Sequence, residues 1–110
     1  MAVLNALKPG LDEKIYERAL VIELTKRGHA VEQQKRFQVR YLGSEVGELI
    51  PDLVVDRTVI VDTKVCSDFN DVHLAQMIGY LSISELQIAL LMSFKHANLM
   101  WKRVVRERAG

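Results

Sequence analysis

The chain has little net charge, one cysteine and few aromatic residues, and each shortage narrows the possible functions. Its formal net charge is +1 over 110 residues, so any binding of DNA or RNA must use a local basic patch. Cys66 is the only cysteine, and a chain that cannot form an intramolecular disulfide is typical of a reducing compartment. Because the chain has one Trp and three Tyr, extended stacking on nucleic-acid bases is not expected.

Long apolar runs, internal repeats and low-complexity segments are also lacking. No stretch reaches the ~18–20 apolar residues of a membrane span, and no signal-peptide pattern opens the chain. We therefore expect a cytoplasmic protein with no membrane partner. The length suits one domain, residues 1–110, which can bury a core without disulfides or structural metals.

What is present is a succession of short helical and extended patterns. Helices are expected at 11–27, with Gly28 as the C-cap, and from N-cap candidates at 67–71 to about 84. Strands are expected at 31–41, 50–55, 59–64, 87–94 and 99–105. The order α-β-β-β-α-β-β predicts an α+β domain with a mixed central β-sheet flanked by helices.

Two of the expected apolar strands contain charged residues, which is unusual because burying an unpaired charge costs several kcal/mol. The first strand contains Asp52, and the second contains Asp62 and Lys64. Side chains alternate along a strand, so Asp62 and Lys64 point to the same face. The short Asp56-Arg57 link favours an antiparallel hairpin that brings Asp52 beside Asp62. Two carboxylates and an ammonium converging in an apolar sheet indicate a metal-dependent hydrolytic site.

The two helical patterns each have a polar face. On the first, Glu13 and Glu17 precede apolar residues in one stripe. This predicts a first turn at the rim of a pocket, or simply acids that favour the positive end of the helix dipole. On the second, Gln76 and Tyr80 share a face, while Leu74, Ile78 and Leu81 form another that suits the core. The polar pair either contacts phosphate or forms an ordinary solvated flank.

In this order, these motifs resemble those of the PD-(D/E)xK nuclease superfamily. Pro51-Asp52 matches its proline-aspartate pair, Asp62-Thr63-Lys64 its acid-x-lysine triplet, and Gln76 with Tyr80 the polar helix of its RecB-type branch. The segment from Gly10 to Tyr16 also resembles the GxxExxY signature, in which Gly10, Glu13 and Tyr16 are the named positions. The resemblance implies a restriction-endonuclease-like fold.

The resemblance also implies a function and a role for each motif residue. It implies a nuclease, a phosphodiester hydrolase that depends on Mg²⁺ or Mn²⁺ and acts on nucleic acid, DNA rather than RNA. Asp52 and Asp62, completed by Glu13, would hold the cation, and Lys64 would position water and steady the developing charge. Gln76 and Tyr80 would support the substrate side of the site.

Further substrate contacts are expected from surface cations. Lys35, Arg36 and Arg40 are the leading phosphate-binding candidates, together with the turn at 95–96, and Lys102 and Arg103 rank below them. Each is otherwise a solvated surface charge, which is the common state of Lys and Arg. Trp101 suits the core or a dimer interface, and cutting two DNA strands would require a homodimer.

Two alternative interpretations of the charged residues stay open at the level of sequence. The Asp52, Lys64 and Asp62 side chains could form an ion-pair cluster that joins two strands, although buried ion pairs stabilise poorly compared with apolar packing. The chain could also be an inactive nuclease fold that serves as a nucleic-acid-binding or assembly module.

Overall fold

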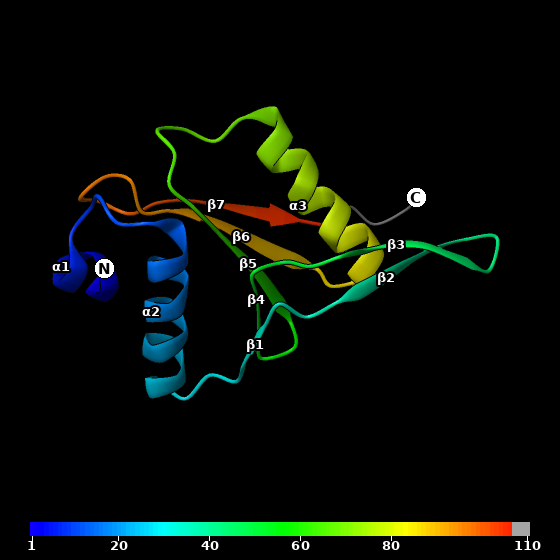
Figure 1. The fold of residues 1–110 in the computed structure, drawn as a ribbon, viewed down its shortest axis with the longest axis horizontal. Helices are drawn as coiled ribbons and strands as arrows, with labels where there is room; N and C mark the ends of the chain where they lie inside the picture. The colour runs from blue at the N-terminus through cyan, green and yellow to red at the C-terminus, as the bar shows by residue number, and fades with distance from the viewer. Residues whose placement is uncertain (107–110) are drawn as a thin grey trace.

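The main sheet is mixed and carries helices on both faces (Figure 1). A computed structural model describes residues 1–106, so residues 107–110 of the expected domain lie outside the described range. The helices are α1 (Ala2–Leu7), α2 (Glu13–Lys26) and α3 (Asp71–Ser84). The strands are β1 (Val31–Gln33), β2 (Phe37–Tyr41), β3 (Ser44–Leu49), β4 (Leu53–Val55), β5 (Val59–Lys64), β6 (Ile88–Ser93) and β7 (Met100–Val105).

Five strands form this sheet in the order β1-β4-β5-β6-β7, and β2 and β3 form a separate hairpin. Only β5 and β6 pair in parallel, whereas the other neighbours in the sheet are antiparallel. The α+β class and the mixed sheet are therefore confirmed. Figure 1 shows the β2–β3 hairpin extending away from the sheet.

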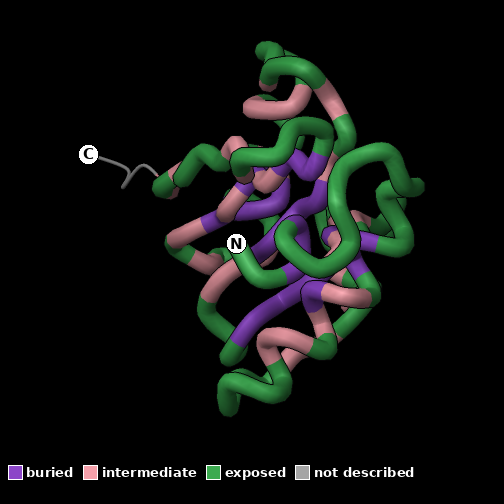
Figure 2. Tube along the Cα trace, turned by 90° about the vertical axis from the view of Figure 1, so that its left-hand side faces the viewer, coloured by how far each residue is buried: buried purple, intermediate pink, exposed green. Residues whose placement is uncertain are grey.

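Two apolar cores lie on the two faces of the sheet because successive strand residues alternate between them. Leu53 and Val61 pack with residues of α1 and α2, whereas Val54 and Ile60 pack with residues of α3. Figure 2 shows the buried segments running through the middle of the trace. The sheet therefore separates two layers, and Lys64 contacts a residue of the α3 layer.

The helix expected at 11–27 is confirmed as α2, which buries the predicted stripe through Tyr16, Glu17 and Leu20. Gly28 follows the helix at φ +91°, a conformation that glycine adopts without a Cβ penalty. Its N–H donates to the carbonyl of Thr25 at 3.0 Å, which satisfies a carbonyl that the helix end leaves open.

The single strand expected at 31–41 is wrong, because the chain turns out of the main sheet after Gln33. Gln34 has φ +53°, a left-handed conformation that cannot continue an extended strand. Its backbone N–H donates to the carbonyl of Asp52 at 3.0 Å. The segment therefore divides into β1, which pairs with β4, and β2, which pairs with β3.

The predicted element order is also incomplete. Helix α1 was not expected because its pattern is only six residues long, and it is held by burial of Val3 and Leu4. Strand β3 was missed because nearly all its residues are exposed. The strand expected at 50–55 begins only at Leu53, since Pro51 has no N–H for a ladder.

The second long helix begins where the N-cap candidates predict. The side chain of Asn70 accepts the N–H of His73 at 2.9 Å, and the Asn70 N–H donates to His73 Nδ1 at 3.2 Å. This reciprocal capping box fixes the start of α3. Each of α2 and α3 has 14 residues, and no helix within 1–106 is suited to crossing a bilayer.

Candidate active site

The β4–β5 hairpin brings Asp52 and Asp62 side by side. Asp56 and Arg57 occupy its turn at φ +51° and +58°, the pair of positive angles that a tight type I′ turn requires. Leu53 pairs with Val61, so Asp52 stands opposite Asp62 one residue further along. The Asp52 N–H donates to Asp62 Oδ1 at 3.3 Å.

Thr63, the middle residue of the Asp62-Thr63-Lys64 triplet, orients the Asp52 carboxylate. Thr63 donates its N–H to Asp52 Oδ2 at 2.9 Å and its hydroxyl to the same oxygen at 3.0 Å. Two donors on one oxygen hold the carboxylate in a fixed direction. Thr63 was not proposed as a site residue, although its place between Asp62 and Lys64 was a usable signal.

Lys64 lies on the same face of β5 as Asp62 and contacts it directly. Its Nζ is 2.8 Å from Asp62 Oδ2, and the Lys64 and Asp62 side chains are 18% and 4% exposed. The pair is therefore largely shielded from water. A charge-assisted hydrogen bond is stronger in such a shielded position than at the surface.

Helix α3 extends this network across the site. Lys64 Nζ also donates to Gln76 Oε1 at 3.1 Å, and Gln76 Nε2 donates to the Tyr80 hydroxyl at 3.0 Å. A continuous line of hydrogen bonds thus runs from Asp62 to Tyr80. The apolar face expected on this helix is only partly buried, because Ile78 is 58% exposed whereas Leu81 is 1% exposed.

Glu13 enters from the first turn of α2, which a buried tyrosine anchors. The Tyr16 hydroxyl donates to the Lys8 carbonyl at 2.6 Å and accepts the Leu11 N–H at 3.0 Å. The Tyr16 ring stacks on Phe94, with centroids 5.0 Å apart. Two of the three signature positions therefore have visible places: Tyr16 pins the loop before α2, and Glu13 opens the helix.

The three carboxylates are coupled electrostatically. Burial raises the pKa of Asp62, and the neighbouring charge of Asp52 raises it further. Burial also raises the pKa of Glu13, with Asp52 adding to the rise and Lys64 opposing it. Glu13 is therefore close enough to interact with both groups. The cluster holds more negative charge than its surroundings favour, which a cation would relieve.

Lys64 and Tyr80, at the two sides of Gln76, both keep their protons at neutral pH. Burial lowers the pKa of Lys64, but the hydrogen bond and charge of Asp62 outweigh it and leave that pKa raised. Burial and the charges of Asp62 and Asp52 raise the pKa of Tyr80 to about 12. Lys64 is therefore a cation and Tyr80 a neutral phenol.

The donor set suits a hard divalent ion, because every candidate ligand is a carboxylate oxygen. Within residues 1–106, no three His, Cys, Asp or Glu side chains are gathered closely enough to enclose a metal ion. The site instead offers the Asp52–Asp62 pair, with Glu13 in electrostatic range. Their chemistry fits Mg²⁺, which keeps several water ligands and needs few from the protein.

Two supporting residues, Glu17 and Gln34, were not proposed as site residues from the sequence. Glu17 is 2% exposed, and its Oε2 accepts Lys14 Nζ at 2.9 Å and Gln34 Nε2 at 3.4 Å. Gln34 in turn holds the Asp52 carbonyl through its backbone N–H. Glu17 was visible as part of the acidic stripe, whereas nothing in the sequence marked Gln34, whose role depends on its left-handed conformation.

The three leading cationic candidates lie outside this cluster. Lys35 Nζ pairs with Glu32 and Arg36 with Glu48, each at 3.3 Å. Arg40 donates to Gln38 Oε1 at 2.7 Å. Their contact with nucleic acid stays a prediction. Trp101 is 61% exposed, so its placement in the core is wrong.

Comparison with known protein families gives a match over nearly the whole chain. The family model described as the PD-(D/E)XK nuclease superfamily matches residues 1–104. No curated protein matches the chain. The GxxExxY signature and the RecB-type branch stay predictions.

Solved structures with similar folds include nucleases. An alkaline exonuclease, LHK-Exo from Laribacter hongkongensis, aligns with a TM-score of 0.62 and 14% identity over 86% of this chain and 56% of its own. Its complex with dAMP aligns at 0.63 and 14% identity, covering 86% and 55%. The structure of SSO0001 aligns at 0.66 and 12% identity, covering 87% and 50%. The chain thus spans about half the length of these proteins, and their likeness establishes a restriction-endonuclease-like fold.

Proposed function

We propose that this chain, which belongs to the PD-(D/E)XK nuclease superfamily, is a metal-dependent phosphodiester hydrolase that cuts nucleic acid. The observation that carries the proposal is the arrangement on the β4–β5 hairpin. Asp52 and Asp62 are linked through the Asp52 N–H, and Lys64 Nζ lies 2.8 Å from Asp62 Oδ2. An ion-pair cluster with a purely structural role accounts for this less well, because burying two carboxylates beside each other raises the pKa of Asp62 rather than stabilising its charge.

Each residue has a distinct proposed role. Asp52 and Asp62 would hold the cation, with Glu13 completing the set from α2. A divalent cation supplies a water of lowered pKa and screens the charge of the phosphodiester. Lys64 would donate a charge-assisted hydrogen bond to the oxygen on which negative charge develops. Gln76 and Tyr80 would support the substrate, by contacting its phosphate backbone rather than the reacting phosphate.

The substrate and setting are proposed on narrower grounds. Mg²⁺ is favoured, with Mn²⁺ as an alternative ion, because the ligands are carboxylates. DNA is the proposed substrate because the alkaline exonuclease LHK-Exo, which shares this fold, also has a solved structure in complex with dAMP. Lys35, Arg36 and Arg40 would contact phosphates, and a homodimer would be needed to cut both strands. The lone Cys66 suits the reducing cytoplasm.

The test is a cleavage assay with Mg²⁺ or Mn²⁺ on single- and double-stranded DNA and RNA. We expect cleavage of DNA that EDTA stops and that the variant Lys64→Ala loses. Retardation of an uncut substrate by the parent protein would instead identify an inactive binding module. If the parent protein neither cleaves nor retards any of these substrates, both functions are contradicted.

A further inference from the structure

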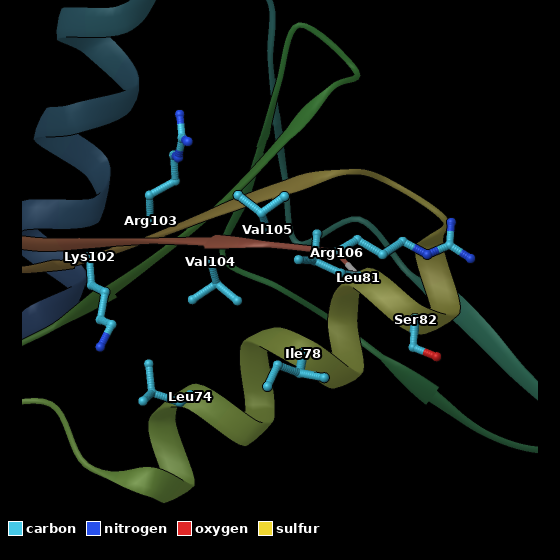
Figure 3. Close-up of a pocket in the computed structure, with 9 residues that line it drawn as sticks. All are labelled: Leu74, Ile78, Leu81, Ser82, Lys102, Arg103, Val104, Val105 and Arg106. Atoms are coloured by element: carbon cyan, nitrogen blue, oxygen red, sulfur yellow. The ribbon is translucent and has the colours of Figure 1, made fainter. Parts of the chain in front are cut away.

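A groove separate from the active site runs between α3 and β7. Its volume is about 670 Å³, and aliphatic side chains such as Leu74, Ile78 and Val104 form its floor. Lys102, Arg103 and Arg106 also line it, and no carboxylate among residues 1–106 does. Figure 3 shows Lys102 and Val104 pointing from β7 towards α3, and Arg103 pointing to the other side of the strand.

The groove lies on the opposite flank of α3 from the active-site residues. An α-helix turns 100° per residue, so Ile78 stands about 200° from Gln76 and about 200° from Tyr80. Gln76 and Tyr80 face Lys64, and Ile78 therefore faces away from it. Whatever binds in the groove does not have to enter the site of cleavage.

The outer edge of β7 adds a second feature, a row of backbone groups directed away from the sheet. Strand β7 is last in the strand order, and no strand within 1–106 pairs with its far side. The Arg106 N–H donates inward to the Gln87 carbonyl at 2.8 Å. Because antiparallel residues alternate between inward and outward bonding, the backbone groups of Trp101, Arg103 and Val105 point outward.

These two features together favour a polypeptide strand over nucleic acid as the occupant. Bases bind single-strand sites largely by stacking on aromatic rings, and the residues that line the groove are aliphatic, cationic or serine. A row of alternating backbone N–H and C=O groups matches the hydrogen-bonding pattern of an added polypeptide strand, and nucleic acid does not present that pattern.

The charges of β7 argue against a second copy of the chain and for an acidic partner. In a two-fold antiparallel pairing of two β7 strands through their outward-bonding residues, centred on Arg103, Arg103 of one copy would stand opposite Arg103 of the other. Like charges placed opposite each other destabilise a strand pair. Basic residues on an edge strand are a common protection against such self-pairing. Acidic side chains would instead satisfy Lys102, Arg103 and Arg106.

We propose that the outer edge of β7 and the α3–β7 groove bind an extended acidic and apolar segment of a partner protein as a sixth strand of the sheet. Aliphatic side chains on one face of that segment enter the groove over Ile78. Acidic side chains on the other face lie beside Arg103, and acidic side chains at the two ends of the groove face reach Lys102 and Arg106. Because successive side chains of a strand point to opposite faces, a segment in which acidic and aliphatic residues alternate presents one kind on each face.

The test is selection from a random peptide library displayed on phage, followed by titration of the enriched peptide. We expect peptides in which Asp or Glu alternates with aliphatic residues. Ile78→Glu, and separately Lys102→Glu with Arg103→Glu, should each lower the affinity about tenfold or more, as loss of an interface anchor does. Val72→Glu is the matched control on α3, since Val72 is exposed at 75% outside the groove. Lys26→Glu is the control for charge, and both controls should bind like the parent.

Strand pairing has its own signature in the peptide. N-methylation at alternate positions should abolish binding when it blocks the N–H groups that face β7, and should be tolerated at the positions between. Equal effects at both sets of positions overturn the pairing.

The proposal is also overturned if no peptide is enriched relative to the Ile78→Glu protein, or if enriched peptides are basic. A dimer of the parent that Ile78→Glu dissociates would show that a second copy occupies the groove. Lys64→Ala should bind the peptide unchanged, which keeps this test independent of cleavage.

Discussion

Asp62 keeps a carboxylate where both burial and a neighbouring charge oppose its ionisation. The residue is 3% exposed, and burial and Asp52 raise its pKa. Lys64 and the Asp52 N–H offset part of this cost by donating to its two oxygens. A buried carboxylate beside a second carboxylate and an ammonium is unfavourable for stability. Such groups are typical of functional sites, which often trade stability for activity.

The raised pKa of Asp62 predicts the sign of a pH effect on stability. Its ordinary value is 3.8, and a group whose pKa is raised on folding contributes stability below its unfolded pKa that is lost as pH rises through the folded pKa. In EDTA, the free energy of unfolding of the parent should therefore fall relative to Asp62→Asn as pH rises above that ordinary value. Urea unfolding at several pH values measures this difference.

Asp56 provides a control of opposite sign. A hydrogen bond with His29, together with the Ala30 N–H, lowers the pKa of Asp56, so its contribution is present above the unfolded pKa and lost as pH falls. The parent should accordingly gain stability relative to Asp56→Asn as pH rises. Parallel pH curves for the parent and Asp62→Asn would contradict the electrostatic account of the site.

Lys64 is the residue whose removal should separate catalysis from metal binding. If its ammonium acts on the developing charge, Lys64→Ala should lower the cleavage rate by ~10²–10³, the usual cost of an oriented donor. The rise in melting temperature with Mg²⁺ should stay close to that of the parent, because the carboxylates are retained. Lys26→Ala, an exposed change on α2, is the matched control. Unchanged cleavage by Lys64→Ala would contradict the proposed action of Lys64 on the developing charge.

At the scale of elements, the loop before α2 depends on one buried phenol. Tyr16→Phe keeps the stacking on Phe94 but removes both hydrogen bonds of the hydroxyl, to the Lys8 carbonyl and from the Leu11 N–H. We expect a loss of about 1–3 kcal/mol in the free energy of unfolding, since partly buried groups are left unpaired. Cleavage should also decrease, because Glu13 lies just beyond this loop.

Tyr41→Phe is the control for that change, because Tyr41 is 69% exposed on the hairpin. Chemical denaturation of both variants and their cleavage rates give the comparison. If the two changes had the same small effect, the hydroxyl of Tyr16 would have no anchoring role.

Helix α3 contributes two residues that we expect to matter less than Lys64. Gln76→Ala removes an acceptor of the Lys64 ammonium, and Tyr80→Phe removes the acceptor of Gln76 Nε2. Both should mainly weaken substrate affinity, because neither is proposed to contact the reacting phosphate. A higher KM with nearly unchanged kcat would agree with this. A fall in kcat as large as that of Lys64→Ala would place them in the reaction itself.

At the scale of the whole molecule, metal binding should appear as stability. A ligand that binds only the folded state stabilises it by RT ln(1 + [L]/Kd), about 2.7 kcal/mol at a hundredfold excess over Kd. Mg²⁺ or Mn²⁺ should therefore raise the melting temperature of the parent, and Asp52→Asn should remove most of that rise. Glu45→Gln, a change on the outlying hairpin, should leave the rise intact. An equal rise in the parent and in Asp52→Asn would mean that the ion binds elsewhere.

The sequence by itself determined the features that depend on local periodicity. Alternation of period two placed Asp62 and Lys64 on one face of β5, and the short Asp56-Arg57 link predicted the hairpin that brings Asp52 beside Asp62. The exact register also depends on Thr58 as a third loop residue, since Val55 pairs with Val59. The helical period likewise identified the buried stripe of α2 and the Gln76–Tyr80 face of α3. These features were predictable because each depends on neighbours within a few residues.

The tertiary structure alone decided the features that depend on distant partners. The chain leaves the sheet at Gln34, whose left-handed backbone ends β1 and whose N–H makes a last bond to the Asp52 carbonyl. Lys64 reaches Gln76 only because α3 packs across the face of the sheet on which Lys64 lies. Ile78 has the apolar character of a core residue yet stays exposed beside an edge strand. A pattern states which face of an element is apolar. Whether that face is covered depends on the order in which the strands assemble, since burial is a property of what packs against a residue.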